Sequence, residues 1–290
     1  MKGVGGGWLD GFIGMALFAG SLPATRAAVG GLSPWFVSGA RAAIAACLAA
    51  AALLALRQPW PRRADLASLT YVALGVVVGF PVLTGLALTR VSSAHALAFT
   101  ALLPVCAAIF SVLGGEKRPP PLFWLFSAAG AAIVISYALG DEVEASLLGD
   151  GLLVVAIAVC GIGYAEGGRL ARRLGGWQTI SWALVMCWPL SATASLIWLP
   201  TAPAPPAAWI GLGYVSVFSM FVGFIFWYRG LARGGAASVG QLQLLQPLIG
   251  LALAAALLGE SVPPSLIATA LGAVVCVAGA RWASLKPAIG

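Results

Sequence analysis

The sequence predicts an all-α integral membrane protein, in which ten transmembrane helices form two inverted five-helix repeats and both termini are cytoplasmic. Hydrophobic residues make up 61% of the 290 residues and charged residues 9%, whereas a soluble domain is about half apolar and about a quarter charged. Apolar stretches of about 20 residues, long enough to cross a hydrocarbon core of about 30 Å, recur along the whole chain. One pattern of proline, glycine and glutamate also occurs twice.

Ten spans follow one another with short connections between them. We expect them at about residues 8–28, 33–56, 66–88, 92–114, 121–139, 147–168, 177–199, 208–231, 236–258 and 264–284. The first span could be read as a cleaved signal peptide, because Lys2 precedes an apolar run. Asp10 interrupts that run, and removing the span would leave the two halves unequal, so we expect it to stay.

The net charge of +7 is explained by topology. Basic residues gather in the segments predicted to be cytoplasmic, whereas Arg90 stands alone among those predicted to be external. The acidic turn with Asp141, Glu142 and Glu144 is also external. This distribution follows the positive-inside rule. It indicates orientation in the bilayer of a cell inner membrane, and it predicts no nucleic-acid partner.

Two segments repeat one pattern. Residues 93–120 read SAHALAFTALLPVCAAIFSVLGGEKRPP, and residues 238–264 read SVGQLQLLQPLIGLALAAALLGESVPP. With a one-residue gap, Pro104 aligns with Pro247 and a Gly-Glu pair in each segment precedes a Pro-Pro pair. Chance similarity between alanine- and leucine-rich segments is the alternative, but the shared prolines and glutamates exceed what composition supplies. The segments therefore indicate an internal repeat.

The repeat divides the chain into residues 1–140 and residues 141–290. Five spans per half is an odd number, so the second half must enter the membrane upside down relative to the first. The loop with Lys117 and Arg118 is then cytoplasmic, and its external counterpart carries serine and valine instead. The second copy thus lacks positive charge where the positive-inside rule disfavours it.

The span at 236–258 combines three glutamines with a proline in an otherwise apolar stretch. Polar or irregular helix inside a bilayer is tolerated where it is buried in protein or lines a wet cavity. At about 100° per residue, Gln243 and Gln246 lie roughly 60° apart and Gln241 lies elsewhere. We therefore expect Gln243 and Gln246 to line a substrate cavity and Gln241 to serve the inner mouth or a helix contact. Hydrogen bonding between helices is the alternative for all three.

Further candidates for substrate binding are His95, Phe99, Trp188 and Arg41. His95 and Phe99 share a helix face at positions i and i+4. His95 could equally be a packed, hydrogen-bonded core residue. Trp188 lies near the middle of its span, where an inward indole would wall a cavity. Arg41 lies about 12 Å inside the membrane, so it needs either a structural partner or a substrate carboxylate.

Four prolines are candidate hinges, because proline removes a helix hydrogen bond and clashes with the preceding turn. They are Pro23, Pro81, Pro104 and Pro247. By contrast, Asp150 fits a helix start, where its charge favours the helix dipole, and Glu166 can pair with Arg169. The five cysteines lie in apolar runs without metal-binding spacing, so no metal site or cofactor is predicted.

The paired Pro and Gly-Glu segments, the run WYRGLARGGAASVG and the arginine in SGARAAIAA resemble the drug/metabolite transporter superfamily, specifically its ten-helix EamA-type permeases. The resemblance covers nearly the whole chain and implies a secondary transporter, with many relatives exporting amino acids and other metabolites. This chain has Gln246-Pro247 where many relatives have Glu-Pro, which puts carboxylate-based proton coupling in doubt. The aromatic amino acid exporters are a neighbouring subgroup, suggested by the tryptophans, Phe99 and His95.

We therefore expect a carrier that works by alternating access, with a small-molecule substrate bound near the midplane between the repeats. Amides and aromatic rings suit a zwitterion with an apolar side chain, such as an aromatic or other neutral amino acid, better than a phosphate. Drug or other metabolite efflux, or a channel, is the alternative. An intramembrane enzyme is not expected, because the sequence has no HExxH motif and no serine with a partner base.

Overall fold

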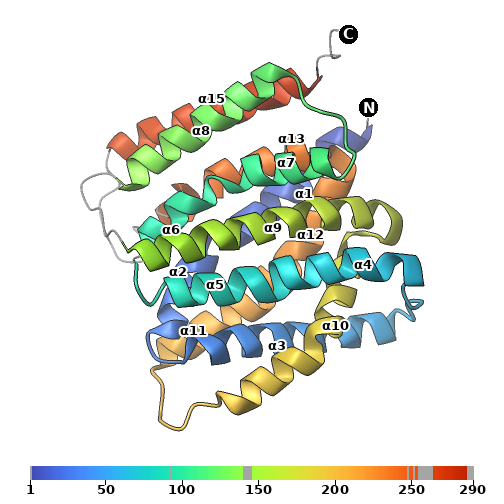
Figure 1. Cartoon of the computed structure of the whole chain (residues 1–290), viewed down its shortest axis with the longest axis vertical. Helices are drawn as coiled ribbons and strands as arrows, with labels where there is room; N and C mark the ends of the chain where they lie inside the picture. Colours follow the sequence, from blue (N-terminus) through green and yellow to red (C-terminus); the bar gives the residue numbers. More distant parts are fainter. Residues whose placement is uncertain are drawn as a thin grey trace.

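The computed structural model describes residues 2–91, 93–139, 146–246, 248–250, 252–253 and 264–285. These residues form helices that lie alongside one another in a bundle, with no β-strand among them (Figure 1). Six helical stretches are long and apolar enough to cross a membrane: Gly6–Val29, Pro34–Ala55, Arg63–Ala87, Leu147–Leu174, Gly176–Ile197 and Pro206–Gly234. The all-α class is therefore confirmed. The number of ten crossings and the side of the termini stay predictions, because the span at 236–258 is described only in part.

The first half of the chain forms α1 (Lys2–Ala19), α2 (Ser21–Val29), α3 (Pro34–Ala55), α4 (Arg63–Val72), the π-helix η1 (Ala73–Gly79), α5 (Phe80–Ala87), α6 (Ser93–Thr100), α7 (Leu103–Leu113) and α8 (Pro121–Leu139). Prolines open α3 and α8. Proline fits the first helical turn because the N–H that it lacks would have no partner there.

The second half forms α9 (Leu147–Leu174), α10 (Gly176–Ile197), α11 (Pro206–Tyr214), the π-helix η2 (Val215–Gly223), α12 (Phe224–Gly234), α13 (Ala236–Gly240), the 3₁₀-helix η3 (Gln241–Leu245) and α15 (Pro264–Leu285). Single glycines join α9 to α10 and α12 to α13. Gly175 and Gly235 have φ values of 98° and 82°, which glycine adopts without steric cost.

The two halves interleave. Helix α1 packs along α12, α3 along α10, and α8 along α15, while α9 packs against α7 and the α4–η1–α5 stretch. In Figure 1, α8 and α15 form one edge of the bundle and α3 and α10 the opposite edge. Small residues permit these close approaches. A Cβ on Gly14 would lie 2.8 Å from the backbone nitrogen of Trp227, and one on Gly167 would lie 2.1 Å from the ring of Tyr228.

The candidate hinge prolines lie beside helix irregularities. Helix α1 ends before Gly20, and α2 contains Pro23 in its first turn. Pro81 follows the π-helix η1 at the start of α5, and Pro104 lies at the start of α7, just after the break between α6 and α7. A missing proline N–H is tolerated at such helix starts. Hinge motion itself stays a prediction, and Pro247 lies outside the described residues.

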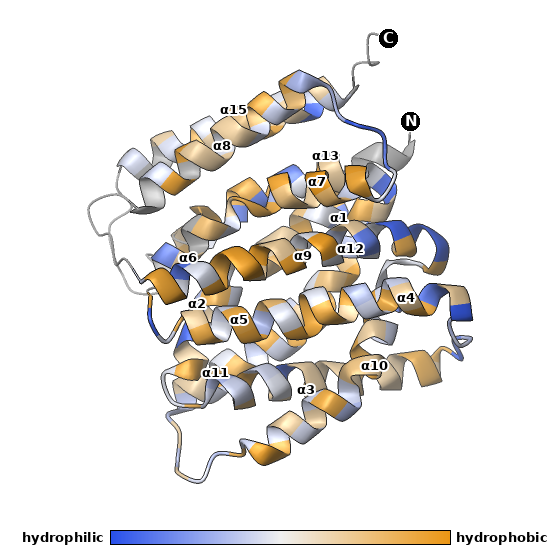
Figure 2. Cartoon of the chain, viewed as in Figure 1, coloured by the Kyte–Doolittle hydropathy of each residue, from blue (hydrophilic) through white to orange (hydrophobic). Residues whose placement is uncertain are grey.

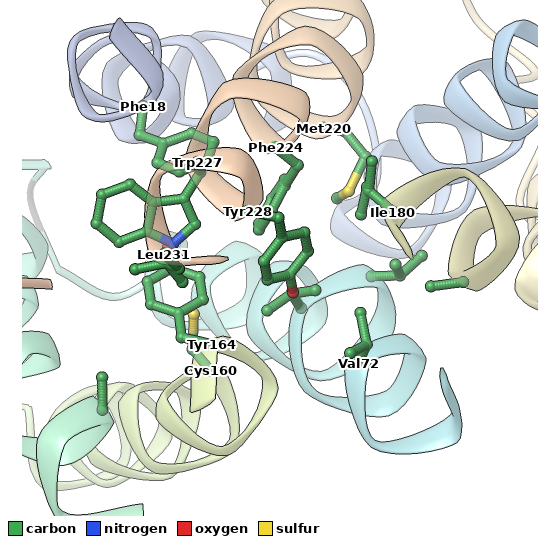
Figure 3. Close-up of a cluster of buried hydrophobic side chains, with 14 of the residues drawn as sticks. Phe18, Val72, Cys160, Tyr164, Ile180, Met220, Phe224, Trp227, Tyr228 and Leu231 are labelled. Carbon is green, nitrogen blue, oxygen red and sulfur yellow. The ribbon is translucent and has the colours of Figure 1, made fainter. Parts of the chain in front are cut away.

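The centre of the bundle is aromatic. Phe18, Tyr164, Phe224, Trp227 and Tyr228 come from three helices and pack against one another, as Figure 3 shows. The Tyr164 ring lies 5.2 Å from that of Trp227, centroid to centroid. Many large apolar side chains are also exposed on the outside of the helices, among them Leu54, Leu196 and Ile210. Hydrophilic residues gather at the helix ends and connections (Figure 2). An apolar outer surface fits a chain solvated by lipid tails.

Candidate functional site

A small cavity lies inside the helical bundle, next to the aromatic centre. Its volume is about 20 Å³, which holds roughly one water molecule. The cavity is lined by Phe18, Ser21, Leu22, Arg41, Val76, Phe80, Leu103, Tyr164, Ser219, Phe224 and Gln246. Both halves of the chain contribute to this wall. A molecule as large as an amino acid does not fit this volume.

Arg41 places a positive charge in this cavity. Its side chain is 3% exposed. The Nη2 atom donates to Ser219 Oγ at 3.4 Å, and Ser219 Oγ in turn donates to Ser21 Oγ at 3.0 Å. Among the described residues, no carboxylate lies within 4.0 Å of the guanidinium, and Nε has no hydrogen-bond partner. A buried cation without a counter-ion is costly, so an anionic group placed here would be stabilised.

The two glutamines predicted to line a cavity together lie on one helix face, but Gln246 belongs to the described cavity wall and Gln243 does not. Gln243 is the third residue of η3 and Gln246 follows that helix, and a 3₁₀-helix aligns side chains at i and i+3. Gln246 is buried at the cavity wall and donates from Nε2 to the carbonyl of Phe18 at 3.4 Å. Gln243 lies behind the wall and donates to the hydroxyl of Tyr164 at 3.4 Å. The structure thus brings Gln246 and Arg41 to one cavity, with Gln243 supporting it through Tyr164.

Gln241 points elsewhere, as the sequence indicated. Its Oε1 atom accepts a hydrogen bond from Ser127 Oγ at 3.0 Å, which ties η3 to α8. Three polar residues of the wall were missed by sequence reasoning: Ser21, Tyr164 and Ser219. Ser21 lies two residues before a proline and Ser219 lies near the middle of its span. Both are polar residues inside apolar spans, which is the same pattern that singled out the glutamines. Their shared location depends on tertiary packing.

His95 and Phe99 lie together but outside this cavity wall. Their ring centroids are 5.3 Å apart. His95 Nε2 lies 2.7 Å from Asp150 Oδ1, across the two halves. Asp150 lies in the first turn of α9, as predicted for a helix-start group. The N-cap itself is Ser146, whose Oγ accepts from the N–H of Gly149 at 3.2 Å, and the sequence did not indicate the contact of Asp150 with His95.

The expected inward position of Trp188 is wrong. Its side chain is 47% exposed, and it does not contribute to the cavity wall. The buried face of α10 runs through Ile180, Leu184 and Cys187, and Trp188 lies roughly 80° around the helix from Ile180. Its indole therefore faces outward, where lipid would solvate it.

Ion pairs join the two halves at the end of the bundle where the arginines of α9 and α12 lie, which we call the basic end. Asp10 of α1 is almost fully buried and binds both Arg229 at 2.8 Å and Arg233 at 2.9 Å on α12. Further pairs join Asp65 to Arg173 and Glu116 to Arg172, each at 2.7 Å. In every one of these pairs, the first half supplies the acid and the second half the arginine. The expected local pair of Glu166 with Arg169 is also present.

This architecture defines a polytopic helical membrane protein with a small internal cavity, whose mainly apolar wall carries a few polar groups from both halves. The sequence profile of the EamA-like transporter family matches residues 6–138 and 147–285. The chain therefore belongs to the EamA-like transporter family, as its resemblance predicted. It is also similar to the transporter YdeK of Bacillus subtilis (strain 168), which is described as uncharacterized. The two are 54% identical over 278 residues, covering 95% of this chain and 96% of that protein.

The fold also occurs in a solved crystal structure. This chain superposes on it with a TM-score of 0.76 and 20% sequence identity, covering 96% of this chain and 97% of the other. At that identity the likeness concerns the fold alone.

Proposed function

We propose that this protein is a secondary transporter of the cell inner membrane that exports small metabolites by alternating access, with aromatic and other neutral amino acids as its substrates. The observation that carries the proposal is Arg41, a buried cation in a closed cavity without a described counter-ion. A substrate carboxylate would supply the missing charge and could take hydrogen bonds from Nε and Nη2 together. The rest of the cavity wall is mainly apolar, which suits an uncharged side chain.

The amides and hydroxyls provide the remaining selectivity. Gln246 and Tyr164 offer polar atoms to the cavity on the side formed by η3 and α9, while Phe18 and Phe224 offer aromatic surface. Ligand sites are mostly apolar with a few polar groups that fix orientation. A zwitterion with an apolar side chain matches this set better than a phosphate ester, because the wall has a single described cation.

Two inverted repeats support alternating access. In an inverted repeat, each span of the first half corresponds to the span five places further along. The first and eighth spans are in contact through α1 and α12, and their counterparts, the sixth and third spans, are in contact through α9 and α4–η1–α5. The pairs α3–α10 and α8–α15 each join a span to its own counterpart. The π-helices η1 and η2 also occupy the third span of each half. Inverted repeats that meet around a midplane site provide two related conformations, one open to each side. We place the halves at residues 1–140 and 141–290.

The ion pairs between halves are suited to gating. Asp10, Asp65 and Glu116 hold one end of the bundle shut through arginines of the second half. At the other end the second half supplies the carboxylate, because Asp150 belongs to the second half and its partner His95 to the first. With a cavity of about 20 Å³ between them, opening toward either side requires that one set of pairs separates. The basic end is the cytoplasmic end under the positive-inside rule.

The proposal is tested by counterflow in proteoliposomes. Vesicles preloaded with unlabelled phenylalanine should accumulate labelled phenylalanine transiently, and uptake should saturate. Phenethylamine, which has the same ring and amine but no carboxylate, should compete poorly. Flux that stays linear with concentration and shows no exchange would indicate a channel, and equal competition by the amine would indicate an efflux carrier that does not recognise the carboxylate.

A topology experiment tests the inverted repeat separately. Single cysteines introduced at Lys117 and in the turn 141–144 should react with a membrane-impermeant maleimide from opposite sides of the membrane. Labelling of both from the same side would contradict the inverted arrangement.

A further inference from the structure

A second cavity lies at the basic end of the molecule, apart from the cavity around Arg41. It measures about 400 Å³ and lies where the last turns of α9 and α12 meet the first turn of α10. Arg172, Arg229 and Arg233 supply its charge, and Trp177 belongs to its wall. The described linings of the two cavities have no residue in common. The second cavity is therefore separate from the cavity around Arg41.

The three arginines are only partly neutralised. Asp10 serves both Arg229 and Arg233, and Glu116 serves Arg172. Among the described residues, three guanidinium groups thus share two carboxylates in this cavity. Each guanidinium has five N–H donors, more than these carboxylates engage. The arginine side chains also remain 39–48% exposed, so they can meet a ligand without unfolding the bundle.

Helix α10 presents its N-terminus to the cavity. It is 22 residues long and begins at the cavity, where Gly176, Trp177 and Gln178 form part of the wall. The first N–H groups of a helix lack intrahelical partners, and the helix dipole favours an anion at this end. Its N-terminus packs closely against α12, since a Cβ on Gly176 would lie 2.5 Å from the backbone nitrogen of Arg229. The last turns of α9 and α12 bring the negative ends of their dipoles to the same cavity, so its net positive charge comes from the three arginines, and the free N–H groups of α10 add hydrogen-bond donors.

We propose that this cavity binds a phosphate group, supplied by the headgroup of an acidic phospholipid. Guanidinium groups match phosphate oxygens through paired N–H donors. Basic pockets between transmembrane helices at the cytoplasmic surface suit anionic headgroups, and Trp177 can lie at the headgroup level as interfacial indoles do. A volume of about 400 Å³ exceeds a bare phosphate ion and leaves room for the glycerol portion. A soluble phosphate ester shares this chemistry and is the other source.

Lipid titration of the full-length protein, followed by native mass spectrometry, tests the site. In detergent, the protein should retain one phosphatidylglycerol at concentrations where phosphatidylcholine does not bind. Arg172→Gln should weaken that binding at least tenfold. Arg62→Gln is the matched control, because it removes the same charge at the same end but outside the cavity. Ala232→Trp keeps every charge and fills the cavity, so it should also weaken binding.

The outcomes separate the possible explanations. The site would be overturned if Arg172→Gln and Ala232→Trp bound phosphatidylglycerol as well as the unmodified protein does. It would also be overturned if Arg62→Gln weakened binding as much as Arg172→Gln, because that result would indicate a diffuse effect of surface charge. A thermal-shift titration with inorganic phosphate forms the second arm. If phosphate stabilises the protein in an Arg172-dependent way and phosphatidylglycerol does not bind, the lipid source is refuted and the phosphate site stands.

Discussion

Replacing Arg41 with methionine distinguishes a substrate contact from a structural anchor. In this structure, the guanidinium has one described hydrogen bond, to Ser219 at 3.4 Å, and no described carboxylate partner. Methionine fills a similar space, is flexible and carries no charge. Exchanging a buried charge for an apolar group of similar volume is often neutral or stabilising. The thermal midpoint of the purified Arg41→Met protein should therefore be unchanged or higher.

Substrate affinity should fall in the same variant. A hydrogen bond to a charged group contributes about 1.5–3 kcal/mol, and about 1.4 kcal/mol corresponds to a factor of ten. The apparent Kd for phenylalanine should thus rise about 10- to 150-fold. The Kd for phenethylamine should change little, because it has no carboxylate to lose a partner.

The assay combines counterflow with a thermal-shift measurement on the same preparations. Ser219→Ala is the matched control, since it removes the described hydrogen bond to Arg41 and keeps the charge. We expect Ser219→Ala to retain most of the affinity for phenylalanine. A thermal midpoint lowered by several degrees in Arg41→Met, with phenylalanine affinity intact, would show that Arg41 is a structural residue and would refute the reasoning.

Three further predictions concern other parts of the molecule. Gln246→Ala should reduce transport several-fold at unchanged expression, because the lost amide faces the cavity; normal flux at equal protein level would remove Gln246 from the site. Asp10→Asn should raise the reactivity of a cysteine introduced at Ala232, because a neutral amide holds Arg229 less tightly; unchanged reactivity would contradict a gate. Gly167→Ala should lower the thermal midpoint by several degrees, because its Cβ would overlap the buried Tyr228 ring; an unchanged midpoint would contradict the packing.

The helical class and most helix boundaries could be predicted from the sequence. Hydropathy reports the length of each apolar segment directly, because a bilayer requires about 20 residues per crossing. Proline positions also indicated where helices become irregular, since the missing N–H is local to the residue. The pairing of Glu166 with Arg169 was predictable for the same reason, because residues three apart on a helix are neighbours.

The candidate site was only partly predictable. Gln246 and Arg41 were recognised as polar residues in apolar spans, and the structure brings them to one cavity. Trp188 has the same apparent signal, but it faces outward. A tryptophan is stable both in lipid and in a protein core, so its presence in a span does not tell which way it points. A buried arginine or glutamine has fewer acceptable environments, and its position is therefore more informative.

The sequence by itself determined that this chain is a helical membrane protein, where most of its helices lie and that Arg41 and Gln246 are polar residues inside apolar spans. These properties depend on composition and on contacts within a few residues. Only the tertiary structure decided that Asp10 meets Arg229, that Asp150 meets His95, and that three arginines converge on a second cavity. Such contacts join residues far apart in the chain, and they depend on how the halves interleave. The energy that fixes that arrangement comes from close packing of many small and aromatic side chains, which no single segment encodes.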